Sequence, residues 1–239
     1  MSGRYYEAEH VEAYRQLRRE GLNQWNDLHP GERSQGYDDF ETRSFLDRVL
    51  PADGTGLSVL EYGCGTGAAA CFLAARGFAV TAVDLVPDAI AMARQFAAER
   101  GLDVRFAVQD ICRWPEPDDR FDYVIDCFCL QSIVTDADRA AVLAGVRSRL
   151  EPGGRYLITT AMYDPARAYE DDHYDPATGV VWVAAEPAAP DAVERAGGWW
   201  VPHRRHLTPE ALRRELDQHG FTVLEQAGRL GGELVCTRR

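Results

Sequence analysis

The fold of this chain is decided by nine residues, Val59-Leu60-Glu61-Tyr62-Gly63-Cys64-Gly65-Thr66-Gly67. The apolar run Leu57–Glu61 predicts a short buried strand, and the small, apolar run Ala68–Arg76 predicts a helix that Gly77 ends. A glycine loop between a strand and a helix lets backbone N–H groups approach a ligand, because no Cβ intervenes. The spacing also satisfies the dinucleotide-binding fingerprint, so the loop alone does not identify its ligand.

The alternation of strand and helix continues beyond this loop. Further strands are predicted at Phe78–Val83, Val104–Val108, Phe121–Cys127 and Arg155–Thr160, with helices at Asp88–Arg100 and Asp136–Leu150. After a helix that starts at Thr208, the strands Phe221–Gln226 and Glu233–Thr237 are joined so closely that they must pair antiparallel. The pattern predicts an α/β fold with a Rossmann-like, doubly wound sheet.

We expect one domain over residues 1–239, with additions to its core. Residues 1–50 form a helical cap, with one helix over Glu7–Glu20 and a second that Asp38 or Asp39 caps. Residues 51–160 and 207–239 form the core, and residues 161–206 form an inserted lid, in which Val180–Ala184 and Trp199–Val201 can pair as a hairpin. Long connections at this edge of a sheet are usually functional, although a surface flap is the alternative.

The composition excludes several function classes. The 239 residues carry 38 acidic and 26 basic side chains, and the net charge of −12 disfavours a nucleic-acid partner. Every one of the 26 basic residues is arginine, so Schiff-base chemistry and a lysine-dependent phosphate loop are excluded. The six cysteines form no Cys-x-x-Cys pair, the N-terminus is polar, and no apolar run is long enough to cross a membrane. We therefore expect a reduced, cytoplasmic protein without a membrane partner.

Three acidic residues near the glycine loop indicate which kind of ligand it binds. Glu61 precedes the loop, where it would repel a pyrophosphate but can hold an ammonium group. Asp84 ends the second strand, 21 residues after Gly63, and suits the two hydroxyl groups of a ribose. Asp110 ends the third strand beside Ile111, a pair that suits the amino group and ring face of adenine. Together they indicate a ligand with an adenosine half and a cationic amino-acid half.

With these features the sequence resembles the class I S-adenosylmethionine (SAM)-dependent methyltransferases, over about residues 57–160 and 207–239. The matching segments are the glycine loop with its strand, Val83-Asp84-Leu85, Val108-Gln109-Asp110-Ile111, Phe121-Asp122-Tyr123-Val124-Ile125-Asp126 and Leu150-Glu151-Pro152-Gly153-Gly154-Arg155. The resemblance implies a seven-stranded sheet of order 3-2-1-4-5-7-6 in which only the last strand of the chain is antiparallel. It also implies SAM as the methyl donor.

The resemblance further assigns residues to parts of the donor. The glycine loop would contact the methionine part, Asp84 the ribose, and Asp110 the adenine amino group. The residues expected at the cofactor are Glu61, Gly63, Gly65, Gly67, Asp84, Leu85, Asp110, Ile111, Asp126 and Cys127. Leu85 and Ile111 would flank the adenine, and Asp126 and Cys127 would lie near the sulfonium. We interpret the thiols of Cys127 and Cys129 as packing groups rather than nucleophiles.

The segment after the fourth strand departs from parts of the family. Cys127-Phe128-Cys129-Leu130-Gln131-Ser132 lacks the paired histidines of many members, the Asp/Asn-Pro-Pro-Tyr of nucleobase and glutamine-amine methylases, and the Pro-Cys of cytosine-C5 methylases. We therefore expect a small-molecule acceptor that is methylated on oxygen or nitrogen. Which acceptor and which atom are left open, as is the choice between a monomer and a homodimer.

Histidines on the acceptor side supply the candidate base. His206 directly precedes the helix cap Thr208, and an ordinary pKa of about 6.5 suits proton removal near neutrality. His203 is the competitor, followed by His29 or a tyrosine of the cap. A metal site on His173, His203 and His206 is a weaker alternative, and we expect no metal. The acidic stretch 163–186 could steer an amine substrate or be a solvated loop.

Two other functions compete with methyl transfer. A nicotinamide-dependent oxidoreductase uses a similar sheet, but Glu61, Pro152-Gly153-Gly154 and the closing hairpin disfavour it. A non-catalytic SAM-binding module is the second alternative, which the intact acidic residues disfavour.

Overall fold

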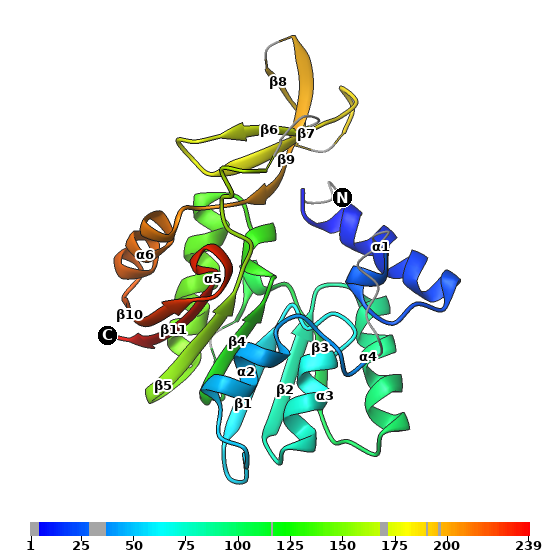
Figure 1. Cartoon of the computed structure of the whole chain (residues 1–239). Coiled ribbons are helices and arrows are strands. Elements are labelled where there is room, and N and C mark those ends of the chain that lie inside the picture. The colour runs from blue at the N-terminus through cyan, green and yellow to red at the C-terminus, as the bar shows by residue number, and fades with distance from the viewer. Residues whose placement is uncertain (1–4, 29–36, 116, 168–171, 190, 196) are drawn as a thin grey trace.

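The architecture is that of two sheets with helices around the larger one (Figure 1). The computed structural model describes residues 5–28, 37–115, 117–167, 172–189, 191–195 and 197–239. His29 and residues 168–171 of the acidic stretch lie outside the described residues.

The large sheet has seven strands in the order β10-β11-β5-β4-β1-β2-β3. The strands are β1 (Ser58–Tyr62), β2 (Ala79–Asp84), β3 (Arg105–Val108), β4 (Phe121–Cys127), β5 (Leu150–Thr159), β10 (Phe221–Ala227) and β11 (Glu233–Arg238). β1 to β5 pair parallel, whereas β11 is antiparallel to both β5 and β10. The expected strand order, with only the last strand antiparallel, is confirmed.

Successive residues of the strands point to opposite faces of the sheet, and both faces are buried. Val59, Ile125 and Leu157 pack on the face covered by α2 (Arg43–Val49), α3 (Ala68–Ala75) and α4 (Pro87–Glu99). Residues adjacent to these in the strands, such as Leu60 and Tyr156, pack on the opposite face. That face is covered by α5 (Asp136–Arg149) and α6 (Pro209–Gln218).

The N-terminal cap lies over one end of this core. The predicted helix Glu7–Glu20 is confirmed as α1, and Gly21 ends it in the left-handed conformation. Tyr14 and Leu17 pack with Val86 at the start of α4. The predicted start of the second helix is wrong, because α2 begins at Arg43 instead of after Asp38 or Asp39.

The reason for this later start is a tertiary contact that precedes the helix. The buried Tyr37 donates its hydroxyl hydrogen to the carbonyl oxygen of Thr66, 2.7 Å away, at the glycine loop. This contact and a bond from the Arg43 guanidinium to the carbonyl oxygen of Asp38 hold residues 37–42 outside the helix.

The insertion forms a second sheet of four strands in the order β6-β7-β9-β8 (Figure 1). They are β6 (Asp172–Asp175), β7 (Val180–Ala184), β8 (Val193–Arg195) and β9 (Gly198–Arg205). The predicted pairing of Val180–Ala184 with Trp199–Val201 is confirmed, because β7 and β9 are antiparallel neighbours. They do not form a simple hairpin, since β8 lies between them in the chain and pairs with the other edge of β9. The sequence did not indicate β6 and β8, which are short strands with many polar residues.

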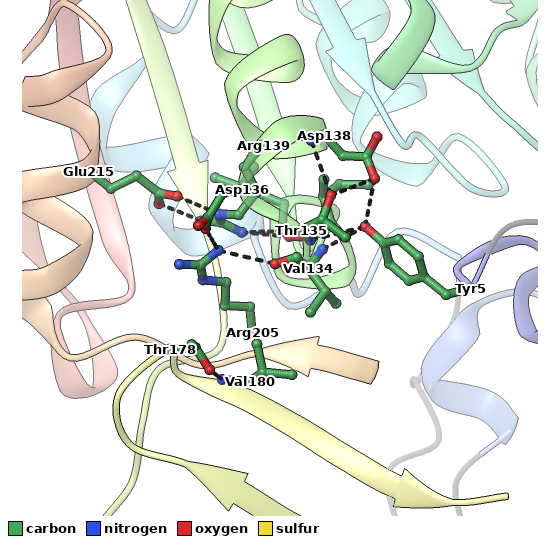
Figure 2. Close-up of polar contacts among 12 residues, drawn as sticks. Tyr5, Val134, Thr135, Asp136, Asp138, Arg139, Thr178, Val180, Arg205 and Glu215 are labelled. Atoms are coloured by element: carbon green, nitrogen blue, oxygen red, sulfur yellow. Dashed lines mark hydrogen bonds and ion pairs between the residues drawn. The ribbon is translucent and has the colours of Figure 1, made fainter. Parts of the chain in front are cut away.

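A buried ion pair joins the two helices behind the sheet. The Arg139 side chain is only 2% exposed and donates from Nε and Nη2 to the two carboxylate oxygens of Glu215, at 2.5 and 2.6 Å. Its Nη1 donates to the carbonyl oxygens of Leu130 and Ile133. The pair therefore ties α5, α6 and the segment after β4 to one another (Figure 2).

Removing one partner of this pair tests its contribution to stability. We expect Glu215→Ala to lower the free energy of unfolding by about 3–5 kcal/mol, because it leaves a buried guanidinium without its counter-ion. Urea denaturation measures the loss. Asp119→Ala, which breaks the exposed pair with Arg105, is the control and should cost about 1 kcal/mol or less. Equal losses in the two variants would contradict the role given to the buried pair.

Candidate active site

A cavity of about 760 Å³ lies at the carboxyl ends of β1, β2, β3 and β4. In open α/β sheets this edge is where ligands bind. The glycine loop and the segment after β4 form its floor, and residues of α1 and β9 form its roof. From the sequence we expect eleven residues at the site, ten at the donor and one as the base. Nine of them line this first cavity: Glu61, Gly63, Gly65, Asp84, Leu85, Asp110, Ile111, Cys127 and His206. Gly67 and Asp126 do not line it.

The glycine loop is closely approached from two sides. Gly63, Gly65 and Gly67 all have positive φ, between +54° and +79°, which favours glycine. A Cβ on Gly65 would lie 2.6 Å from the Tyr14 hydroxyl oxygen of α1. A Cβ on Gly63 would lie 2.4 Å from the Cys129 sulfur. Gly67 instead stands at the N-cap of α3, behind the cavity.

Glu61 is buried at 2% exposure beneath this loop. Burial is the main cause that raises its pKa to about 8, and the nearby Asp84 raises it further. A backbone bond from Ala70 and a bond from the Cys127 thiol act in the opposite direction. The second carboxylate oxygen, Oε2, has no hydrogen-bond partner among the described residues. A buried acid with an unpaired oxygen is a site for a cationic group.

Asp84 fixes the shape of the loop. Its carboxylate oxygens accept hydrogen bonds from the backbone N–H of Gly65 at 2.8 Å and of Val86 at 2.9 Å. Burial raises the pKa of this carboxyl group, whereas these backbone bonds lower it. A carboxylate has about four acceptor positions. Asp84 therefore retains acceptor capacity for a ligand while it holds the loop.

Asp110 lies at the end of the cavity next to the buried Ile111 and the half-buried Leu85. Its Oδ1 accepts a hydrogen bond from the backbone N–H of Cys112 at 2.9 Å. The buried Tyr6 also donates its hydroxyl hydrogen to this carboxylate, 3.3 Å from both oxygens. Sequence reasoning missed Tyr6, because no local pattern relates it to Asp110, 104 residues away.

Asp126 is fully buried and is not among the residues that line the cavity. Its carboxylate accepts hydrogen bonds from the backbone N–H groups of Cys129 at 2.7 Å and Leu130 at 3.1 Å, and from the Tyr62 hydroxyl at 3.0 Å. Burial raises its pKa to about 7. In the structure Asp126 supports the segment after β4. Its expected place near the sulfonium stays a prediction. Its neighbour Cys127 lines the cavity, and burial raises the pKa of its thiol.

His206 lies in the wall of the cavity at 4% exposure. Burial, and then the charges of Arg167 and Arg204, lower its pKa to about 4. Its Nδ1 atom has no hydrogen-bond partner among the described residues. His206 is therefore neutral at physiological pH. Sequence reasoning, which started from the ordinary pKa, did not anticipate this depression.

The other candidate histidines differ in their surroundings. His203 lies 3.1 Å from Oε1 of Glu9 in α1, and Arg204 binds both oxygens of the same carboxylate. Burial raises the pKa of Glu9, but the hydrogen bonds from His203 and Arg204 outweigh it and lower the pKa well below its usual range. These contacts link α1 to β9 across the roof. Within the described ranges, no group of three His, Cys, Asp or Glu side chains could hold a metal ion. No helix in those ranges is long and apolar enough to cross a membrane.

The segment after β4 is tied to three parts of the protein (Figure 2). The Tyr5 hydroxyl accepts hydrogen bonds from the backbone N–H of Val134 at 2.9 Å and Thr135 at 3.3 Å. Arg205 of β9 donates to the Val134 carbonyl oxygen at 3.1 Å and pairs with Asp136. Arg139 binds the segment from the other side, as described above. The cap, the small sheet and the core therefore share one anchoring point.

Comparisons with known proteins agree with this geometry. A model of the family described as "Methyltransferase domain" matches residues 59–154. A 2-heptyl-1-hydroxyquinolin-4(1H)-one methyltransferase of Mycobacteroides abscessus is 38% identical over 101 residues, which are 42% of this chain and 44% of that protein. A ubiquinone biosynthesis O-methyltransferase of Aeromonas salmonicida is 30% identical over 177 residues, 72% of this chain and 66% of that protein. The chain spans less than half of the length of the first curated relatives that it matches.

Among solved structures, the glycopeptide N-methyltransferase MtfA in complex with SAM is similar over 85% of this chain and 93% of its own. The TM-score is 0.58 and the sequences are 27% identical. The CcbJ methyltransferase of Streptomyces caelestis has a TM-score of 0.63 at 18% identity over 89% of this chain and 94% of its own, which shows the shared fold alone. With the strand order, the glycine loop and the acidic residues at the strand ends, these likenesses place the chain in the class I SAM-dependent methyltransferases.

Proposed function

We propose that this protein transfers a methyl group from SAM to an oxygen or nitrogen atom of a small-molecule acceptor. The observation that carries the proposal is the Oε2 atom of Glu61, buried and unpaired beneath the glycine loop within the described structure. An unpaired buried carboxylate oxygen is unfavourable in the free protein, and an ammonium group satisfies it. The amino-acid half of SAM carries such a group.

The remaining cavity residues fit the rest of the donor. Asp84 has acceptor capacity for the ribose hydroxyls, and Leu85 and Ile111 offer apolar surface to the adenine. The adenine amino group would share the Asp110 carboxylate with the Tyr6 hydroxyl. Tyr6 and Tyr14, which the sequence did not single out, would cover the bound donor from α1. Gly67 would act on the loop rather than on the donor.

The bound donor supplies a methyl group on a sulfonium, which an in-line attack by the acceptor atom displaces with the C–S electron pair left on sulfur. The protein's own task is to align the acceptor and to take its proton where it has one. We assign the second task to His206, which is neutral and lines the cavity. His203 is less suited, because it lies against the Glu9 carboxylate. The lid, residues 161–206, would complete the acceptor side.

The net charge and the cysteines indicate the partners and the cellular compartment of the protein. A net charge of −12 disfavours a nucleic-acid partner. All six cysteines are free, which fits a reducing compartment, so we infer a cytoplasmic protein.

Transfer of labelled methyl from SAM to a panel of phenols, amines and carboxylates tests the proposal directly. We expect incorporation into at least one class. Binding of NADH with no binding of SAM, measured as a shift in melting temperature, would instead favour an oxidoreductase.

Asp84 tests the donor site. We expect Asp84→Ala to weaken SAM binding by about 1–3 kcal/mol, because hydrogen bonds with the ribose and with the Gly65 N–H are lost together. Isothermal calorimetry measures the affinity. Asp103→Ala removes an exposed acid outside the cavity and is the matched control. An unchanged affinity in the Asp84 variant would remove the ribose assignment.

Glu61 couples stability to pH. Its pKa is about 8 in the folded protein and about 4.5 when unperturbed, so between these values the folded protein holds a proton that the unfolded chain has lost. The free energy of unfolding contributed by this group therefore falls as pH rises through that window. We expect Glu61→Gln to raise the stability of the free protein at pH 8 by about 1–3 kcal/mol, with no gain at pH 4. Urea denaturation at both pH values measures this.

The same substitution should weaken SAM binding. We expect a loss of about 10- to 100-fold, because the ammonium loses its counter-ion. Between pH 5.5 and 7.5 the parent protein should bind SAM more tightly as pH rises, since Glu61 must ionise, and the variant should lose that dependence. A variant that bound SAM like the parent over this range would contradict the role of Glu61.

His206 tests the acceptor side. We expect His206→Ala to lower kcat by about 10²–10⁴-fold with little change in SAM affinity. Because the pKa of His206 is about 4, the parent kcat should stay level from pH 6 to 8 and fall only toward pH 4. Steady-state kinetics with the best acceptor of the panel measures both. A near-normal kcat here together with a large loss in His203→Ala would move the role to His203.

A further inference from the structure

A second cavity, of about 300 Å³, adjoins the first one. It lies between the end of β5 and the turn that joins β10 to β11, which contains Arg229–Gly231. Both cavities are lined by Phe128, Ala161, Arg167, His206, Arg229 and Glu41. The second cavity is therefore a continuation of the first one on the side away from Asp84 and Asp110, where an acceptor would enter.

Two polar atoms in the wall of the second cavity are left without partners. The Oγ1 atom of Thr159 and the Nδ1 atom of His206 are buried and have no hydrogen-bond partner among the described residues. The two side chains are 6% and 4% exposed. Buried polar groups are nearly always paired in native proteins, so two orphans at one cavity need an explanation. A ligand with a hydroxyl group, which both donates and accepts, satisfies them together.

Part of this wall is apolar, and one residue of that part has a strained backbone. Phe128, Met162 and Leu230 line the cavity. Phe128 has φ of +62°, a conformation that is rare for a bulky residue and that persists mainly at functional sites. Its backbone N–H donates to the carbonyl oxygen of Thr159 at 2.8 Å, so the strained residue is fixed to the strand that carries the orphan hydroxyl. The patch formed by Phe128, Met162 and Leu230 suits a flat apolar body.

The charges around the cavity disfavour a cationic acceptor. Arg167 and Arg204 lie close enough to His206 to make a positive charge on its imidazole unfavourable. Of the three acidic residues that line the second cavity, Asp164 pairs with Arg229 at 3.0 Å and Glu233 pairs with Arg48 at 2.8 Å. The third, Glu41, is exposed, so solvent screens its charge. An ammonium would be repelled here, whereas an oxygen that gains negative charge would be stabilised.

We propose that the second cavity binds the hydroxyl-bearing end of an uncharged, phenol-type acceptor, so that this enzyme methylates oxygen. The proposal rests on the proposed function. The acceptor O–H donates to the imidazole of His206, and the Thr159 hydroxyl donates to the acceptor oxygen. As the new C–O bond forms, the hydroxyl proton passes to His206 and the C–S electron pair stays on the donor's sulfur. The aromatic ring packs against Phe128 and Met162.

Binding of matched probes tests this assignment. The probes are 4-methylphenol, 4-methylbenzylamine and toluene, titrated by ligand-observed NMR at pH 7 into the protein loaded with S-adenosylhomocysteine. We expect 4-methylphenol to bind at least ten times more tightly than either of the other two. Thr159→Val should weaken phenol binding at least fivefold, and Thr159→Ser, which keeps the hydroxyl, should restore it. Thr222→Val, on the exposed face of β10, is the control and should change nothing.

Each other result overturns the proposal. Equal or tighter binding of the amine, an unaltered affinity in Thr159→Val, or no binding of any probe would each remove the phenol assignment. Titration of S-adenosylhomocysteine reports the donor site separately, and we expect the Thr159 variants to keep the parent's affinity for it. If the parent protein does not bind S-adenosylhomocysteine, the proposed function is wrong. The affinities of the three probes would then be compared on the protein without S-adenosylhomocysteine, and the same tenfold preference for 4-methylphenol would be required.

Discussion

The parallel pairing of β1 with β2 and β4 is the constraint on which the site depends. In the register of the sheet Tyr62 faces Val83 on one side and Asp126 on the other, so all three strands end at one level. The residues that follow must therefore meet at one edge. Because the strand ends are close, Asp84 accepts a hydrogen bond from the Gly65 N–H. Glu61 is buried because it lies in β1, between β2 and β4.

The site is built from groups whose burial is unfavourable in the free protein. Burial raises the pKa of Glu61 to about 8 and lowers that of His206 to about 4, and each retains an unpaired polar atom among the described residues. Strain at Phe128 adds to this. The compensation lies away from the cavities, in well-paired groups such as Arg139 and Glu215. Two further buried atoms without partners among the described residues, Trp182 Nε1 and Arg205 Nε, lie in the small sheet. The unpaired groups that line the cavities are the ones that pre-organised binding can use.

The sequence predicted the features that local patterns determine. Short apolar runs located the five parallel strands, and the loop spacing placed Glu61 and Asp84 together. It did not predict contacts between distant segments, such as that of Tyr6 with Asp110, because nothing near either residue encodes the other. Nor did it predict that the Asp126 carboxylate accepts a hydrogen bond from the backbone N–H of Cys129 in the following turn. The expected place of Asp126 near the sulfonium stays a prediction.

The two halves of the cavity share their walls, so neither can be reshaped alone. Phe128 and Cys129 follow β4 in direct succession; the first lines both cavities, and the second touches the glycine loop. The same segment is held by Tyr5 from the cap and by Arg205 from the small sheet (Figure 2). A substitution that widens the acceptor side must therefore alter contacts that also fix the donor side. Leu230, in the turn between β10 and β11, lines the second cavity but not the first. A substitution there can change the acceptor preference without altering the contacts that fix the donor side.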